Sequence, residues 1–305
     1  MLSAAVDSYF ATRRAAGFQL NDPEGILRDF ARFASAKGET LIRTPTVLEW
    51  IRARGGSPLR SCTRLRTVVH LARYLHAEDS RHAIPPEGVF GRHRPRRRPP
   101  FVFTPQQVKA LVQEAATLGP KGSLQPLVYS TLFGLLACTG MRISEALNLP
   151  LEDVTPEGLI VRNTKFGKSR LLPLHPSARK ALDHYLERRC QEGGACESLF
   201  LSMKGRRLHG NTARSVFRRL VQSLGIAGSK GKPRPRLHDL RFYFANQAMT
   251  NCPDDPRGIS RHMVALTTYL GHSDVRNSYW YLEASPKLLS RIAENCEAFV
   301  SGGNR

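Results

Sequence analysis

The sequence predicts a mainly α-helical protein with two domains and one small three-stranded antiparallel sheet. Apolar residues recur at helical spacing over most of the chain, and a short-strand pattern interrupts them once, at 151–174. A segment at 83–100 is too rich in proline and arginine to form a packed element. With 305 residues, 41% of them hydrophobic, the chain can build a packed core in each of two domains.

Charge is the unusual quantity in the composition. There are 46 Lys and Arg residues against 25 Asp and Glu residues, which gives a net charge of +21. Such an excess predicts a polyanionic partner, and nucleic acid is favoured over a membrane surface. No apolar run is long enough to span a membrane, and Asp7 and Tyr9 lie where a signal peptide would be apolar, so we expect a cytoplasmic protein.

The first domain, expected at 1–82, is a small helical bundle. Thr44 and Ser57 each precede a proline, a pattern typical of a capped helix start. The last predicted helix of the bundle has a basic face, which is either solvated or lies along a phosphate backbone. Its basic residues are Arg60, Arg64, Arg66, Arg73, His70 and His76.

The segment 83–100 is predicted to be a linker between the domains. It holds two Pro-Pro pairs and five arginines between positions 92 and 98. Like charges at this density repel one another unless an anion lies between them. We therefore interpret the segment as an extended linker that touches DNA, in preference to a disordered tether.

The second domain, expected at 101–305, contains a polar pair beside its most apolar helix. The helix at 124–137 is apolar almost all round and should be buried; it ends at Gly140. Arg142 and Glu145 then lie three apart, on one face of the next helix. An arginine beside a buried helix is usually paired or holds a ligand, so Arg142 binds an anion or forms a structural bridge to Glu145.

Further candidate catalytic residues lie in the C-terminal third of the sequence. His238 and Arg241 are three apart and share a helical face, and His272 follows a predicted helix stop. Tyr279 and Tyr281 lie roughly 200° apart on a helix, so only one of them can face a pocket that holds the histidines. Lysines in the second turn of the sheet, at 165 and 168, are uninformative by themselves. Convergence of a tyrosine, two histidines and an arginine suggests phosphoryl chemistry.

In this order, the motifs closely resemble those of the tyrosine recombinase (phage integrase) family. The stretch 139–147 resembles the first arginine box, 165–170 the hairpin lysine segment, 238–241 the H-x-x-R box and 270–272 the L-G-H box. The family's nucleophile follows the last histidine by nine positions, which selects Tyr281. The resemblance thus implies six catalytic residues: Arg142, Lys165, His238, Arg241, His272 and Tyr281.

The resemblance also implies a two-domain, C-shaped clamp around DNA, with a core-binding helical bundle and an integrase-type catalytic domain. The ending 279–284 is similar to that of transposon-borne members, which favours a mobile-element recombinase over a chromosome-dimer resolvase. Phe242 stands where many members have a second histidine.

In the implied reaction the Tyr281 hydroxyl attacks a phosphodiester and forms a 3′ phosphotyrosine. His238 is the candidate base, the two arginines and His272 hold the phosphate oxygens, and Lys165 protonates the leaving 5′ oxygen. Glu145 would orient the pocket. Neither a cofactor nor a metal is expected, because the arginines supply the positive charge, no carboxylate cluster is apparent, and the six cysteines lack zinc spacing; their thiols should be reduced and mostly buried.

The expected function is site-specific DNA recombination, with double-stranded DNA and a homo-tetrameric synapse as partners. Partner recombinases from the same element are a further candidate. Two alternatives remain: a type IB topoisomerase that relaxes DNA without synapsis, and a DNA-binding accessory protein that has lost the reaction.

Overall fold

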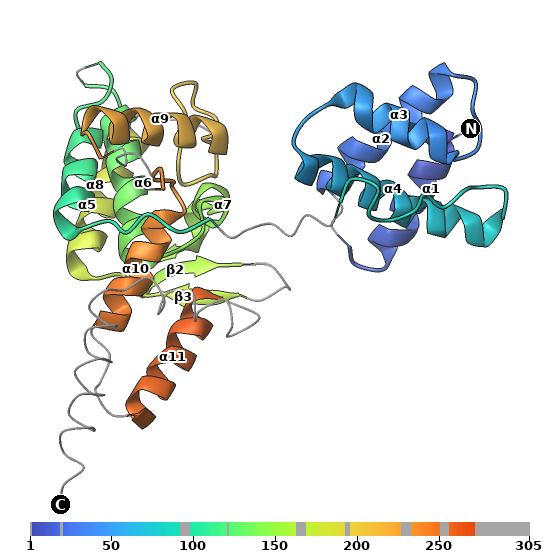
Figure 1. The fold of residues 1–305 in the computed structure, drawn as a ribbon. Helices are drawn as coiled ribbons and strands as arrows, with labels where there is room; N and C mark the ends of the chain where they lie inside the picture. The colour runs from blue at the N-terminus through green and yellow to red at the C-terminus, as the bar shows by residue number, and fades with distance from the viewer. Residues whose placement is uncertain are drawn as a thin grey trace, which may run out of the picture. The chain divides into compact units, whose positions relative to one another are not determined.

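The computed structural model describes residues 2–18, 21–91, 98–120, 122–162, 169–192, 196–226, 233–250 and 256–271. The chain divides into two compact units, 1–97 and 98–305 (Figure 1). The division falls inside the segment predicted as a linker. A search of the described helices finds none with the length and apolar character of a membrane span.

The first unit is a helical bundle of α1 (Leu2–Ala15), α2 (Asn21–Ala36), α3 (Thr44–Arg54) and α4 (Pro58–Glu78). Each helix contributes apolar side chains to one core, including the fully buried Phe10, Phe30, Trp50, Val68 and Leu71. The rings of Phe30 and Trp50 meet edge to face with centroids 5.3 Å apart.

Only one of the two predicted helix caps in the bundle is correct. The Ser57 side chain accepts a hydrogen bond from the backbone N–H of Arg60 at the start of α4, as predicted. Thr44 is instead the first residue of α3, and Arg43 occupies the cap position without a side-chain hydrogen bond. Pro45 fixes the start of this helix without help from a cap, because its φ is preset for the first turn.

The first half of the predicted linker lies against the bundle. The backbone N–H of Ala83 donates to the carbonyl of Ile42 over 2.9 Å, and the Arg73 guanidinium pairs with Glu87 over 2.7 Å. Phe90 packs on the core of the bundle. Residues 83–91 therefore extend the surface of the first unit, including its basic helix α4.

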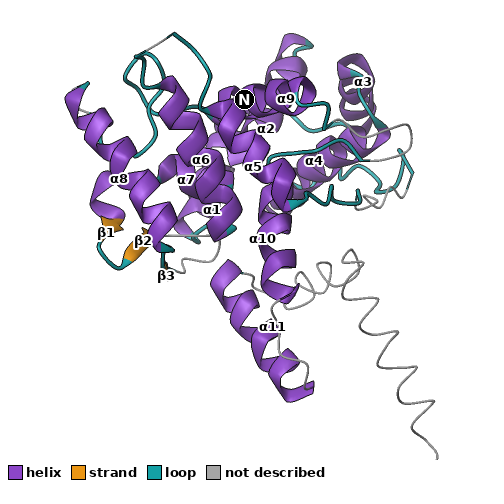
Figure 2. Cartoon of the chain, turned by 90° about the vertical axis from the view of Figure 1, so that its left-hand side faces the viewer, coloured by secondary structure: helices purple, strands orange, loops and turns teal. Residues whose placement is uncertain are grey.

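The second unit is built around α6 (Figure 1). The buried residues of α6 lie on all sides of the helix, as its apolar sequence predicts. Helices α5, α8 and α10 pack directly against α6. In two views α11 extends from the body of the unit next to α10 (Figure 1, Figure 2). The helices are α5 (Pro105–Ala115), α6 (Gln125–Thr139), α7 (Ile143–Asn148), α8 (Pro176–Gln191), α9 (Gly210–Ser223), α10 (Asp239–Thr250) and α11 (Pro256–Leu270).

The predicted three-stranded antiparallel sheet is present in the order β1 (Val154–Thr155), β2 (Gly158–Val161), β3 (Arg170–Leu172), after a short 3-10 turn at Leu151–Asp153. Ile160 pairs with Leu171, so β2 and β3 are the two arms of a hairpin. The predicted lysine turn between them lies outside the described residues.

Helix ends in the second unit partly follow the sequence signals. The pair Thr104-Pro105 predicts a helix start, and α5 begins there, with a capping box between Thr104 and Gln107. Gly271, with φ +64°, follows the last residue of α11, as the predicted helix stop requires. The polar side chain of Asn211 predicts a helix cap at this residue, and this prediction is wrong, because His209 occupies the cap position of α9 and its Nδ1 accepts from the N–H of Asn211. Ser273, which the sequence predicts to cap a helix after Gly271, lies outside the described residues.

The thiols differ from expectation. The four described cysteines are free, as predicted, but none of them is fully buried, since Cys138 and Cys190 are exposed and Cys62 and Cys196 half-buried.

Candidate active site

The end of α6 sets the position of Arg142. Gly140 leaves the helix in the left-handed conformation, with φ +62°, and its N–H donates to the carbonyl of Leu136. The Thr139 hydroxyl donates to Leu135 and accepts from the N–H of Met141 at 3.3 Å. This compact turn places Arg142 at the cap position of α7.

Gly140→Ala should destabilise the protein. A Cβ at this position would lie 2.5 Å from the Phe244 ring and 3.1 Å from Leu270, in a backbone conformation that side chains disfavour. We expect a loss of about 1 to 3 kcal/mol in the free energy of unfolding. Gly134→Ala is the matched control: Gly134 lies inside α6 with open space around its Cβ position, and the change should be neutral or stabilising by about 0.5 to 1 kcal/mol.

Chemical denaturation of both variants would measure these changes. Equal stability of the Gly140 and Gly134 variants would contradict the role given to the turn.

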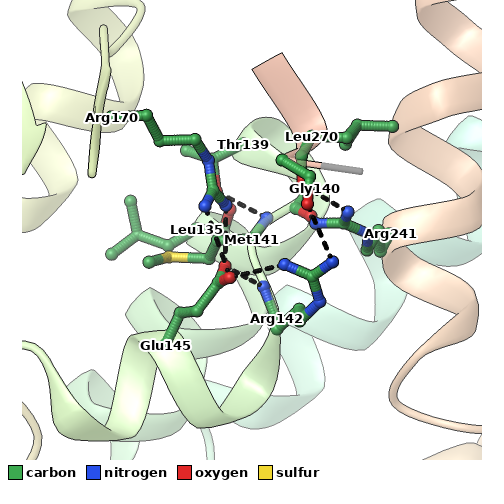
Figure 3. A network of polar contacts seen from close by, with 10 residues as sticks. Leu135, Thr139, Gly140, Met141, Arg142, Glu145, Arg170, Arg241 and Leu270 are labelled. Carbon is green, nitrogen blue, oxygen red and sulfur yellow. Dashed lines mark hydrogen bonds and ion pairs between the residues drawn. The ribbon is translucent and has the colours of Figure 1, made fainter. Parts of the chain in front are cut away.

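One buried carboxylate holds two guanidiniums (Figure 3). Glu145 Oε1 accepts from Arg142 Nη1 at 2.7 Å and from Arg170 Nη1 at 3.3 Å. Oε2 accepts from the Arg142 backbone N–H at 2.8 Å and from Arg170 Nη2 at 2.7 Å. Burial would raise the pKa of Glu145, but the hydrogen bonds and charges of the two arginines outweigh it and lower the pKa. The structural bridge that competed with ligand binding by Arg142 is therefore present.

Arg241 is almost completely buried and joins three helices. Its Nη1 donates to the carbonyl of Gly140 at 2.7 Å, and its Nη2 donates to the carbonyl of Leu270 at 2.6 Å (Figure 3). Arg142 Nη2 donates to the carbonyl of Gly271 at 3.3 Å. Both guanidiniums thus meet the end of α11, directly before position 272.

His238 lies next to these positive charges, at the start of α10. Although His238 as a whole residue is exposed to solvent, desolvation of its ring by neighbouring atoms is the main cause that lowers its pKa. The charge of Arg241 lowers the pKa further, as do those of Arg236 and Arg142, while Asp239 acts in the opposite direction. Asp239 in turn accepts from the backbone N–H of Arg236 at 2.7 Å, which holds the segment before α10 in place. A neutral imidazole is the favoured state at neutral pH.

The structure brings together three of the six predicted catalytic residues: Arg142, His238 and Arg241. The other three, Lys165, His272 and Tyr281, lie outside the described residues. Sequence reasoning missed Arg170, whose only signal is an arginine at the start of a strand with apolar residues. Among the described residues, no group of three His, Cys, Asp or Glu side chains is arranged as a metal site.

Comparison with known proteins assigns the family. Residues 102–287 match the Phage integrase family. An integrase/recombinase of Sinorhizobium fredii, y4rB, is 37% identical over 302 residues, which cover 96% of this chain and 96% of the relative. The chain belongs to the phage integrase family. It is accordingly a tyrosine-type site-specific recombinase, an enzyme that breaks and rejoins DNA strands.

Solved structures of the phage integrase family share the fold. The Tn1549 transposon integrase, in complex with transposon right end DNA, matches with a TM-score of 0.61 at 18% identity, over 95% of this chain and 98% of that chain. A lambda integrase tetramer bound to a Holliday junction matches with a TM-score of 0.57 at 18% identity, over 90% and 77%. The mainly α-helical fold with one small three-stranded antiparallel sheet, expected from the sequence, is confirmed.

Proposed function

We propose that this recombinase cleaves duplex DNA through a transient bond between Tyr281 and the 3′ phosphate. The observation that carries the proposal is that Arg142 and Arg241 are both tied to the end of α11, where their positive charges can hold one phosphate next to position 272. Planar guanidiniums match two phosphate oxygens at once. His272 would add a further hydrogen bond to the same phosphate.

The proposed step exchanges one ester for another. The phenol oxygen of Tyr281 bonds to phosphorus, and the bond from phosphorus to the 5′ oxygen breaks. His238, neutral because of its lowered pKa, takes the phenol proton, and Lys165 gives a proton to the 5′ oxygen. Rejoining reverses each transfer, so the energy of the phosphodiester is kept.

The nicked suicide substrate is the direct test of this function. A duplex carrying the ends of the element that encodes this protein is nicked near the cleavage point, so that the fragment with the free 5′ hydroxyl diffuses away. Trapped protein should then migrate with the DNA on a denaturing gel. Relaxation of supercoiled DNA by the isolated protein, without recombinants from any paired site, would favour the topoisomerase alternative. DNA binding without formation of an adduct would favour the alternative of an accessory protein that has lost the reaction.

The pH dependence should follow His238. At low DNA concentration the rate of adduct formation reports the free protein. We expect the acid limb of this rate below pH 6.5, since the pKa of His238 lies below that ordinary value. Arg236→Met should move the limb to higher pH, because it removes a positive charge and releases Asp239, and both changes raise the pKa. An unchanged limb in this variant would contradict the role of His238 as base.

For the two units we propose the division of labour expected from the sequence. Residues 1–82 bind core DNA, and 101–305 hold the catalytic site. Residues 83–100 link the units and contact the DNA backbone, with 83–91 held against the bundle. The many basic residues support this assignment, as does the exposed Arg66 on α4.

Salt should weaken DNA binding strongly. If about six phosphates are neutralised, affinity falls on the order of 10³-fold between about 50 and 200 mM salt. Arg66→Gln should reduce the slope of log affinity against log salt by about one. Arg54→Gln is the control, because Arg54 is already paired with Asp29 over 2.8 Å. A nearly flat salt dependence would contradict the proposed interface.

Assembly and biological setting are the broader parts of the proposal. A tetramer around two duplexes is supported by the likeness to the lambda integrase tetramer on a Holliday junction. A role in recombining the DNA of a mobile element is supported by the likeness to a transposon integrase. Partner recombinases from the same element and a cytoplasmic location complete the proposal.

A further inference from the structure

Arg170 is buried at the active site without a role in the reaction proposed above. Its side chain on β3 is 13% exposed, and its guanidinium binds both oxygens of Glu145. Its Nε is buried and has no hydrogen-bond partner among the described residues. A Cβ at Gly271 would lie 3.1 Å from its Nη1, so Arg170 also lies against the end of α11.

The net charge of the cluster formed by Arg142, Glu145 and Arg170 suggests what Arg170 does. If Glu145 paired with Arg142 alone, the pair would carry no net charge, and a phosphate would meet a neutralised guanidinium. With Arg170 on the same carboxylate, the three groups carry a net charge of +1. Since these side chains are mostly buried, where charges are weakly screened, this difference acts strongly on a nearby anion.

We propose that Arg170 is a positioning residue for DNA cleavage, because it shares the Glu145 carboxylate and so keeps the net charge around Arg142 positive and the Arg142 guanidinium oriented for the phosphate. This inference rests on the proposed function. Arg170 acts on Arg142 through Glu145, and it does not itself contact the reacting atoms.

The other arm of the hairpin provides a matched control. Arg162 follows β2 and donates from Nε to Asp153 at 2.6 Å, and the Asp153 side chain is 2% exposed. Both arginines therefore anchor the hairpin to a buried carboxylate. Of these two carboxylates, only the one that Arg170 binds also binds Arg142. Comparing variants of Arg170 and Arg162 therefore distinguishes an effect on the phosphate site from the loss of support for the hairpin.

The experiment compares single-turnover cleavage of the nicked substrate at saturating DNA by R170M, R170K and R162M. We expect R170M to slow adduct formation on the order of 10²-fold, with little change in DNA affinity. The carboxylate would then offset the charge of Arg142, an effect comparable in size to the loss of one transition-state donor. R170K, which keeps the charge without the two-pronged contact, should lie in between. R162M should cleave at close to the wild-type rate. Thermal unfolding establishes that each variant is folded.

A double-mutant cycle tests the path through Glu145. In an E145Q background the carboxylate is already neutral, so adding R170M should cost several-fold less than in the wild type. A full loss in that background, or an equally slow R162M, would overturn the proposal.

Arg170 could also act by placing Lys165 on the hairpin, and a substrate with sulfur in place of the 5′ bridging oxygen distinguishes this route from the proposed one. A thiolate leaves without a proton, so this substrate would restore R170M if Arg170 acted only by placing Lys165 on the hairpin. Restoration of cleavage by R170M would therefore also overturn the proposal, and continued slow cleavage would support it.

If the wild-type protein forms no adduct, the proposed function fails. If the wild-type protein forms the adduct and R170M matches its rate, only the role of Arg170 fails.

Discussion

Tyr281→Phe is expected to abolish the covalent adduct with DNA while leaving DNA binding intact. The substitution removes the single oxygen that attacks phosphorus and leaves a ring of nearly the same shape. Tyr279→Phe is the matched control two positions away and should form the adduct normally. The measurement is the adduct on a denaturing gel with the nicked substrate, together with a binding assay for both variants.

The size of this effect follows from the chemistry. A free tyrosine with a pKa of about 10 is ionised in roughly one molecule in a thousand at neutral pH, so even the intact phenol needs a base. Phenylalanine offers no substitute nucleophile. An adduct formed by the Tyr281 variant would show that another residue attacks, and loss of the adduct in the Tyr279 variant instead would move the assignment there.

Arg241→Lys is the second change with a large expected effect. A lysine ammonium is a single point and cannot donate to the carbonyls of Gly140 and Leu270 while also holding a phosphate. Adduct formation should fall by on the order of 10² to 10³. The free energy of unfolding should decrease by about 1 to 3 kcal/mol, because a buried carbonyl loses its donor.

The neighbouring Arg236→Lys is the control for Arg241. Arg236 is 43% exposed in its side chain and pairs with Asp239, and lysine can keep that pair. Single-turnover rates and denaturation curves for both variants, at a temperature where both are folded, separate catalysis from stability. Wild-type cleavage by the Arg241 variant would contradict its place in the phosphate site.

The helices and the sheet could be predicted because their signals are local. An unbroken run of apolar residues defines α6, and Thr104 and Gly271 mark helix ends within a few residues. The cap of α9 was misplaced because His209 and Asn211 are both polar and only two positions apart, so that backbone geometry decides between them.

The candidate site divides in the same way. Arg142 with Glu145, and His238 with Arg241, are neighbours on one turn, so their spacing is informative in the sequence. Arg170 meets Glu145 across 25 positions, and that contact exists only after β3 pairs with β2. The charge balance of the site could therefore not be inferred from spacing alone.

Main-chain oxygens hold both arginines in place. Arg241 donates to the carbonyls of Gly140 and Leu270, and Arg142 donates to the carbonyl of Gly271. Every amino acid supplies such an oxygen, so no exchange of side chain deletes one of these acceptors. Engineering at these positions can disable the site only by bending the backbone, whereas the Glu145 carboxylate is lost with a single codon change. A variant library should accordingly tolerate apolar replacements of the buried Leu270 that keep the helix end in place, and should tolerate few replacements of Glu145.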